Sequence, residues 1–267
     1  VAGSVAEALV APFDDPRIDR AYVNNGGDIA LHLGPGAAFV VGWVVDPDAP
    51  PMRMAQRRSS ARGWIADPPW VDRVGADRPR LDGHFRIDAA SGIRGIATSG
   101  WRGRSFSLGI ADSVTVLATR ASIADAAATV IANAVYADDP RIERVAASAL
   151  RDDSDLGDRL VTRDVPRLPK PVVADALDAG ARAAAAEIAE GRVRGAALAL
   201  QGEVRICLDP ALVHRGVDAP STSGKARLAG RGLFDTLAHA RVEDVARFDV
   251  AVRRGAARPA ASSSTRT

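Results

Sequence analysis

The chain has 267 residues, 47% of them hydrophobic, which is enough for the core of one large domain or two modest ones. Its single cysteine, Cys207, excludes an intrachain disulfide and a zinc site built on several thiolates. The formal net charge is +2, but ten Lys and Arg against five Asp and Glu lie beyond residue 209. The rest of the chain is therefore slightly acidic, and we expect no nucleic-acid partner.

The longest apolar run, GAAFVVGWVV, is about half as long as a segment that spans a bilayer. No basic segment followed by an apolar core opens the chain, and a lone cysteine fits a reducing compartment. We therefore expect a soluble, cytoplasmic protein with no membrane partner. Cys207 lies in VRICLDP, whose alternation is typical of a strand, so it is interpreted either as a buried structural thiol or as a sulfur carrier in an assimilation pathway.

The chain begins at Val1 inside a predicted helix, SVAEALVAPF, and we expect it to be N-terminally incomplete. Two apolar, β-prone runs then flank NNGGD at residues 24–28. Residues 46–83 are rich in Pro, Asp and Arg without a clear period, which indicates a surface loop or insertion.

The later elements begin with strands and end mostly with helices. We predict a strand pair around Ser91-Gly92, a strand within 105–119, helices over 122–137, 140–150 and 171–191, and a hairpin over 195–208 centred on Gly202. Beyond Pro210 we expect little fixed structure except a short helix over 234–248. The chain thus divides into a domain at 1–209 and a disordered basic tail at 210–267. This order favours an α+β fold with an antiparallel sheet packed against helices over alternating βαβ units.

The NNGGD stretch has two interpretations. An Asn-Gly pair between apolar strands is a strong hairpin signal, because both residues tolerate positive φ. Paired glycines such as Gly26 and Gly27 also let a ligand approach the backbone, with the Asn24 side chain and Asp28 beside it. Both interpretations stay open from the turn alone.

Two further stretches carry polar side chains at places where a ligand is often bound. Thr98, Ser99 and Gly100 close a predicted strand, either as a polar loop or as a site for a phosphate or a flavin ring. Asp125 and Thr129 are four residues apart on a predicted helix and share a face, where they are able to bind a hard cation such as Mg²⁺. The alternative for Asp125 is a capping box with Ser122.

These stretches stand in an order that resembles the ApbE superfamily. The shared motifs are NxGGD, a TSG strand end, SVTV, and ADAxAT, which here are residues 24–28, 98–100, 113–116 and 124–129. The segment GIATSGWRGRSFSLGIADSVTVLA most resembles an uncharacterised branch of that superfamily. The resemblance covers about residues 1–209.

The resemblance implies a T-fold-like α+β architecture with a flavin-nucleotide pocket lined by the Asn24–Asp28 loop and the Thr98–Gly100 strand end. Enzymes of the superfamily use Mg²⁺ to move FMN from FAD onto a Thr or Ser of an acceptor protein. Carried over by position, Asp125 and Thr129 would be the cation ligands. FAD or FMN, Mg²⁺ and an acceptor protein are thus the implied cofactors and partners.

The chain departs from the transferases in two places. Where they carry a histidine motif before SVTV, this chain has SFSLGIAD with Asp112 beside Ser113. The N-terminal part of the family domain is largely absent before Val1. A non-catalytic binding or accessory protein with the same fold is therefore the alternative to an FMN transferase.

Overall fold

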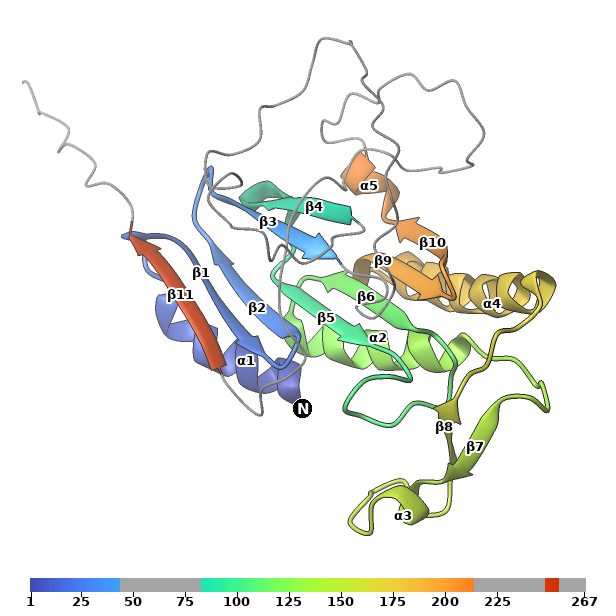
Figure 1. Ribbon diagram of the computed structural model, residues 1–267. Helices are drawn as coiled ribbons and strands as arrows, with labels where there is room; N and C mark the ends of the chain where they lie inside the picture. Colours follow the sequence, from blue (N-terminus) through green and yellow to red (C-terminus); the bar gives the residue numbers. More distant parts are fainter. Residues whose placement is uncertain (44–82, 214–247, 255–267) are drawn as a thin grey trace, which may run out of the picture.

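A seven-stranded antiparallel sheet forms the centre of the molecule, in the order β10-β9-β6-β5-β2-β1-β11 (Figure 1). The computed structural model describes residues 1–43, 83–213 and 248–254. The strands of the sheet are β1 Ile18–Asn25, β2 Asp28–Leu33, β5 Gly95–Ser99, β6 Ser113–Ala118, β9 Val193–Leu200, β10 Glu203–Leu208 and β11 Phe248–Arg254. Every pairing in this sheet is antiparallel, which confirms the predicted α+β class.

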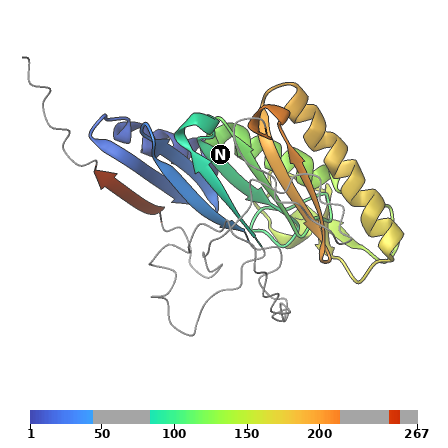
Figure 2. The ribbon, with the colours of Figure 1, turned by 90° about the horizontal axis from the view of Figure 1, so that it is seen from above.

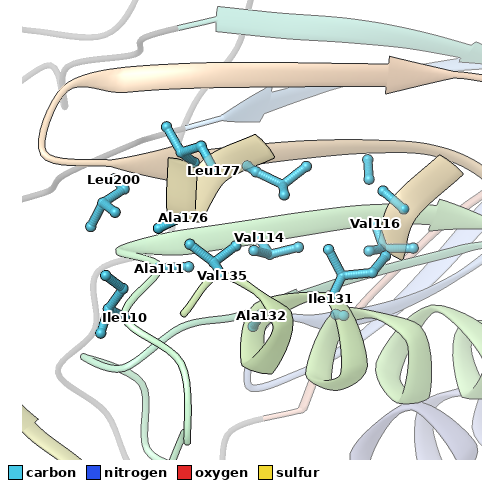
Figure 3. Packing of buried hydrophobic residues seen from close by; sticks show 14 of the residues in the cluster. Ile110, Ala111, Val114, Val116, Ile131, Ala132, Val135, Ala176, Leu177 and Leu200 are labelled. Carbon is cyan, nitrogen blue, oxygen red and sulfur yellow. The ribbon is translucent and has the colours of Figure 1, made fainter. Parts of the chain in front are cut away.

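Three helices cover one face of the sheet: α1 Ala2–Val10, α2 Ala121–Ala134 and α4 Lys170–Ala189. Successive strand residues point to opposite faces, so Val114 and Val116 of β6 both turn toward these helices. They are fully buried there with Ile131 of α2 and Leu177 of α4 (Figure 3). Burial of each such side chain contributes roughly 1.5–3 kcal/mol, so this layer holds the main core.

The opposite face carries a second, smaller core. The hairpin of β3 Ala38–Trp43 and β4 Gly83–Asp88 lies over it and is followed by the 3₁₀ turn η3 Ala89–Ser91. Ile96 and Leu117 turn toward this hairpin and are buried with Ile87. Figure 2 shows α4 running along the other side of the sheet. The sheet is thus covered on both faces by different kinds of element.

Glycines let α2 approach its neighbours closely. A Cβ atom at Gly3 of α1 would collide with the Ala121 carbonyl, and one at Gly95 of β5 would collide with the Arg120–Ala121 backbone. A Cβ at Gly109 would collide with the carbonyl of Ala132 near the other end of the helix. Since backbone cannot move aside as a flexible side chain can, these three glycines fix how deep α2 lies.

The structure corrects two of the predicted elements. The helix predicted over 140–150 forms only at its end: Glu143–Ala146 are the strand β7, and the helix is limited to the single turn α3 Ala147–Leu150. The unpredicted strand β8 Leu160–Asp164 pairs with β7, and this partner overrides the local helical pattern. The strands before and after Ser91-Gly92 exist, but β4 pairs with β3, and β5 pairs with β2 and β6. The helices over 122–137 and 171–191 and the hairpin over 195–208 are confirmed.

Two elements lie beyond residue 209, where the sequence predicts little fixed structure. Pro210–Val213 form the short helix α5, and β11 pairs with β1 at the edge of the sheet. The predicted helix over 234–248 lies almost wholly outside the described residues, as does nearly all of the predicted insertion at 46–83. The division into 1–209 and 210–267 therefore stays a prediction. None of the described helices combines the length and apolar character needed to cross a membrane.

Glu7 of α1 caps the start of α2. Its Oε2 atom accepts hydrogen bonds from the Ser122 amide at 3.1 Å and the Ser122 hydroxyl at 2.7 Å, and its Oε1 atom accepts one from Arg120 Nε at 2.7 Å. Ser122 lies inside the helix, whose N-cap is Arg120 without a side-chain cap. The predicted capping box of Ser122 and Asp125 is therefore wrong, because a carboxylate from a distant helix binds the free amide instead.

Removing this cap should destabilise the fold. Burial alone would raise the pKa of Glu7, but the hydrogen bonds from Ser122 and Arg120 outweigh it and hold the pKa below 4.5. We expect Glu7→Ala to lower the free energy of unfolding at pH 7 by about 1–2 kcal/mol, as loss of a helix cap does. Urea denaturation measures this loss.

A matched control is Glu143→Ala, because Glu143 makes an exposed ion pair with Arg163 and should change stability by less than about 0.5 kcal/mol. The pKa of Glu7 is lowered in the folded state. The contribution of Glu7 to the free energy of unfolding is therefore present at neutral pH and is lost as the pH falls through this lowered pKa. Equal losses for both variants at pH 7 would contradict the capping role.

Candidate functional site

The NNGGD stretch is a tight hairpin turn between β1 and β2, as the turn chemistry predicts. Gly26 has φ +66° and Gly27 has φ +107°, backbone angles that residues with a side chain rarely adopt. Asn24 Oδ1 accepts a hydrogen bond from the Gly27 amide at 2.8 Å, so this oxygen is engaged within the turn. A Cβ atom at Gly27 would have no atom within 4 Å, which leaves open space above that residue.

The turn brings Asp28 within electrostatic reach of Asp125, although the two are far apart in the sequence. Asp28 begins β2 on the sheet face that carries the helices, and Asp125 lies on α2. Burial raises the pKa of Asp28 to about 7, and the negative charge of Asp125 adds to this effect. The amino terminus, Arg104 and the Thr98 backbone act in the opposite direction. Two predicted site residues thus share one electrostatic environment.

Asp125 is fixed by α1. Its Oδ2 atom accepts hydrogen bonds from the Gly3 amide and from the amino group of Val1, both at 2.9 Å. Thr129 lies one turn further along α2, where its exposed hydroxyl donates to the Asp125 carbonyl oxygen at 3.2 Å. That bond uses the proton of the hydroxyl and leaves oxygen lone pairs for a cation. Asp125 and Thr129 therefore keep the neighbouring placement that the sequence predicts.

The TSG strand end divides between the two faces of the sheet. Ile29 pairs with Ile96, so Asp28 lies opposite Ala97, which faces the helices. Ser99, two residues further, is on that same face by alternation. The Thr98 hydroxyl lies on the opposite face, 2.9 Å from the Thr115 hydroxyl. Ser99 is thus on the side of the carboxylates and Thr98 is not.

Gly100 has a packing role that sequence reasoning did not identify. It is buried, and a Cβ atom there would collide with the Asp112 carbonyl oxygen. Asp112, beside it, accepts hydrogen bonds from Trp101 Nε1 at 3.1 Å and from the Gln201 amide. This carboxylate therefore joins the loop after β5 to the turn between β9 and β10.

The loop after β5 also contributes Arg104 to the site. Arg104 is exposed, and its Nη2 atom donates to the Gly26 carbonyl oxygen at 3.3 Å. A side chain at Gly26 would collide with this guanidinium. Local sequence patterns do not predict this contact, because the glycine and the arginine lie 78 positions apart.

The two carboxylates, Asp28 and Asp125, are better suited to bind a cation than to lie near each other without one. Burial is the main cause of the raised pKa of Asp28, and repulsion from Asp125 adds to it. A divalent ion between the two carboxylates would remove this repulsion. No cluster of three or more His, Cys, Asp and Glu side chains suited to a metal is found in residues 1–43, 83–213 and 248–254. A hard cation here would thus need the Thr129 hydroxyl, water or ligand oxygens besides the two carboxylates.

Fold and site together define an α+β protein with paired carboxylates at one end of an antiparallel sheet. A family model described as "AbpE bacteria" matches residues 1–206, and the chain belongs to this family. It is 35% identical over 154 residues to the UPF0280 protein MK0206 of Methanopyrus kandleri, which covers 57% of this chain and 48% of that protein. The chain spans about half the length of this relative. Both matches agree with the resemblance to an uncharacterised ApbE-like branch.

Asp28 should make stability depend on pH between about 4 and 7. Because its pKa is raised to about 7 in the folded protein, the folded state binds this proton more tightly than the unfolded state, where the pKa is about 4. Stability therefore falls as the pH rises through this window. Asp28→Asn cannot ionise, so we expect it to gain about 2 kcal/mol over the native protein between pH 4 and pH 8, after allowing for solvent screening of the half-buried group.

Urea denaturation of both proteins from pH 4 to pH 8 measures this difference. Asp178→Asn serves as the control, since Asp178 is an exposed carboxylate that pairs with Arg205 at 2.8 Å. Curves for Asp28→Asn and the native protein that stay parallel across the whole range would show that Asp28 titrates normally.

Proposed function

We propose that this protein is flavin-nucleotide-associated and carries out Mg²⁺-dependent transfer of FMN from FAD to a Ser or Thr of an acceptor protein. The observation that carries the proposal is that Asp28 and Asp125 lie on the helix-covered side of the sheet within electrostatic reach of each other. Membership of the "AbpE bacteria" family supports it, as does the open backbone at Gly27 beside these carboxylates.

In this proposal each site residue has a distinct task. Asp28, Asp125 and the Thr129 hydroxyl would hold Mg²⁺, which when bound neutralises phosphate charge and stabilises the leaving group. The Gly27 amide donates to Asn24 and is not free to bind a ligand. The turn would instead let a ligand come close to the backbone at Gly27. Ser99 would donate from the floor of the site to a phosphate or flavin oxygen.

The transfer itself exchanges the phosphoanhydride linkage of FAD for a phosphoester linkage to the acceptor. The acceptor hydroxyl oxygen forms a bond to the FMN phosphorus, and the bond from that phosphorus to the AMP phosphate oxygen breaks. AMP leaves with the electron pair of that bond, and the hydroxyl proton passes to a carboxylate or to water. Positioning and charge neutralisation carry most of such a reaction, because phosphoryl transfer needs little covalent help from the protein.

The second candidate is a non-catalytic protein that binds a nucleotide without cleaving it. It is favoured by the segment SFSLGIAD, in which Asp112 makes structural hydrogen bonds to Trp101 and Gln201. The idea of a sulfur carrier has less support, because Cys207 is half-buried and burial raises the pKa of its thiol. A thiol that stays protonated at neutral pH is a poor nucleophile.

Asp125→Asn should abolish Mg²⁺-dependent release of AMP from FAD. Asparagine keeps an oxygen for the Gly3 amide but removes the charge that a cation needs, so we expect a loss of at least about 100-fold. Chromatographic detection of AMP after incubation with FAD, with and without Mg²⁺, measures this.

Asp178→Asn, on the outer side of α4, is the matched control and should keep full activity. Full activity in Asp125→Asn would overturn the metal assignment. FAD binding by the native protein without any AMP release would instead favour the non-catalytic candidate.

Ser99→Ala should weaken FAD binding more than Thr98→Val does. Ser99 lies on the face of the carboxylates, and loss of one hydrogen bond to a charged group costs about 1.5–3 kcal/mol, roughly 10- to 100-fold in affinity. The Thr98 hydroxyl is bound to Thr115 on the other face, so its loss should leave affinity within about twofold. Flavin fluorescence titration compares the two, and a larger effect of Thr98→Val would contradict this arrangement.

A further inference from the structure

The guanidinium of Arg104 lies at the rim of the candidate site and contacts the β1–β2 turn from the loop after β5. It reaches from the loop after β5 to the Gly26 carbonyl in the β1–β2 turn, with 3.3 Å between Nη2 and the oxygen. Its positive charge also acts on Asp28. Arg104 is therefore close to both the glycine turn and the carboxylates.

The contact with Gly26 uses few of the hydrogen-bond donors of the Arg104 side chain. A guanidinium carries five N–H donors, and the bond to Gly26 is the one that Arg104 makes within the described parts of the chain. At 3.3 Å it is longer than the usual 2.9–3.0 Å for an N–H···O bond. The side chain is exposed, so the remaining donors face solvent and the group is able to leave Gly26 at small cost.

The surroundings decide which ligand such a group would bind. A phosphate placed near Asp28 and Asp125 is repelled by their charges unless cations stand beside it. A planar guanidinium matches two phosphate oxygens with parallel hydrogen bonds, which an ammonium group cannot do. The open space above Gly27 leaves room for the ligand next to Arg104.

We infer that Arg104 is the phosphate-binding side chain of this site, which exchanges its bond to the Gly26 carbonyl for paired bonds to phosphate oxygens of a bound nucleotide. The identity of the nucleotide as FAD rests on the proposed function, whereas the recognition of phosphate does not. A structural role for Arg104, as a clamp between loop and turn, would instead affect every ligand equally.

The first test uses Mg²⁺ with inorganic pyrophosphate, which needs no flavin. Calorimetric titration at low salt should show binding to the native protein and about 10- to 100-fold weaker binding to Arg104→Ala, as expected for a lost charge-assisted pair. Arg104→Lys should recover part of the affinity. Arg102→Ala is the matched control: Arg102 is two residues away, lies 3.7 Å from Asp112, stacks on Trp101, and should not matter.

The second test compares FAD with riboflavin, which lacks phosphate. Arg104→Ala should weaken FAD binding by the same factor and leave riboflavin binding unchanged. Equal weakening of both ligands, an equal effect of Arg102→Ala, unchanged pyrophosphate binding in Arg104→Ala, or no pyrophosphate binding by the native protein would each overturn the inference. Arg104-dependent binding of pyrophosphate without any binding of FAD would uphold it and reject the flavin proposal. Urea midpoints confirm that all variants fold.

Discussion

The close packing of α2 on its neighbours is the constraint on which the candidate site depends. Gly3 and Gly95 bring α1 and β5 against the first turn of α2, at distances that no side chain would permit. Asp125 lies one turn further along this helix. Its distance from Asp28 on β2 is therefore fixed by backbone contacts on both sides. A larger residue at Gly3 would collide with both the Ala121 carbonyl and the Cβ atom of Asp125, and would therefore displace that carboxylate.

Helix α1 completes this arrangement with polar contacts. Glu7 binds the start of α2 through Ser122, and the Gly3 amide binds the Asp125 carboxylate. Asn25 of the β1–β2 turn donates to the Ala2 carbonyl oxygen at 3.1 Å, so the turn is tied to the same helix. α1 thus contacts both segments that supply the carboxylates, which makes it part of the site although it carries none of the predicted ligands.

Local patterns in the sequence predict the parts of the fold that need no distant partner. The turn at Gly26 and Gly27, the helix that carries Asp125 and the hairpin at Gly202 are such parts. The strand β7 was predicted as part of a helix from the local pattern, whereas pairing with β8, as between Val145 and Val161, decides the structure. The cap of α2 was misassigned for a similar reason, since Glu7 lies 115 residues from Ser122.

Site residues follow the same division. The resemblance implies a flavin pocket at Asp28 and a cation ligand at Asp125, whereas the separation of Ser99 from Thr98 depends on strand register, which local patterns do not specify.

A purely structural explanation accounts for Asp125, which pairs with the amino group of Val1 and the Gly3 amide, but not for Asp28 beside it. A fold gains stability when a buried charge has an opposite partner, and two neighbouring carboxylates instead raise the cost of ionising either one. Asp28, half-buried beside Asp125, carries that cost in its raised pKa. In the proposed function, a cation bound between them would turn this repulsion into binding energy, and the guanidinium of Arg104 would supply the complementary partner for an anion. A site for a metal-bound nucleotide needs carboxylates to bind the cation and a cationic group, such as a guanidinium, to bind the phosphate.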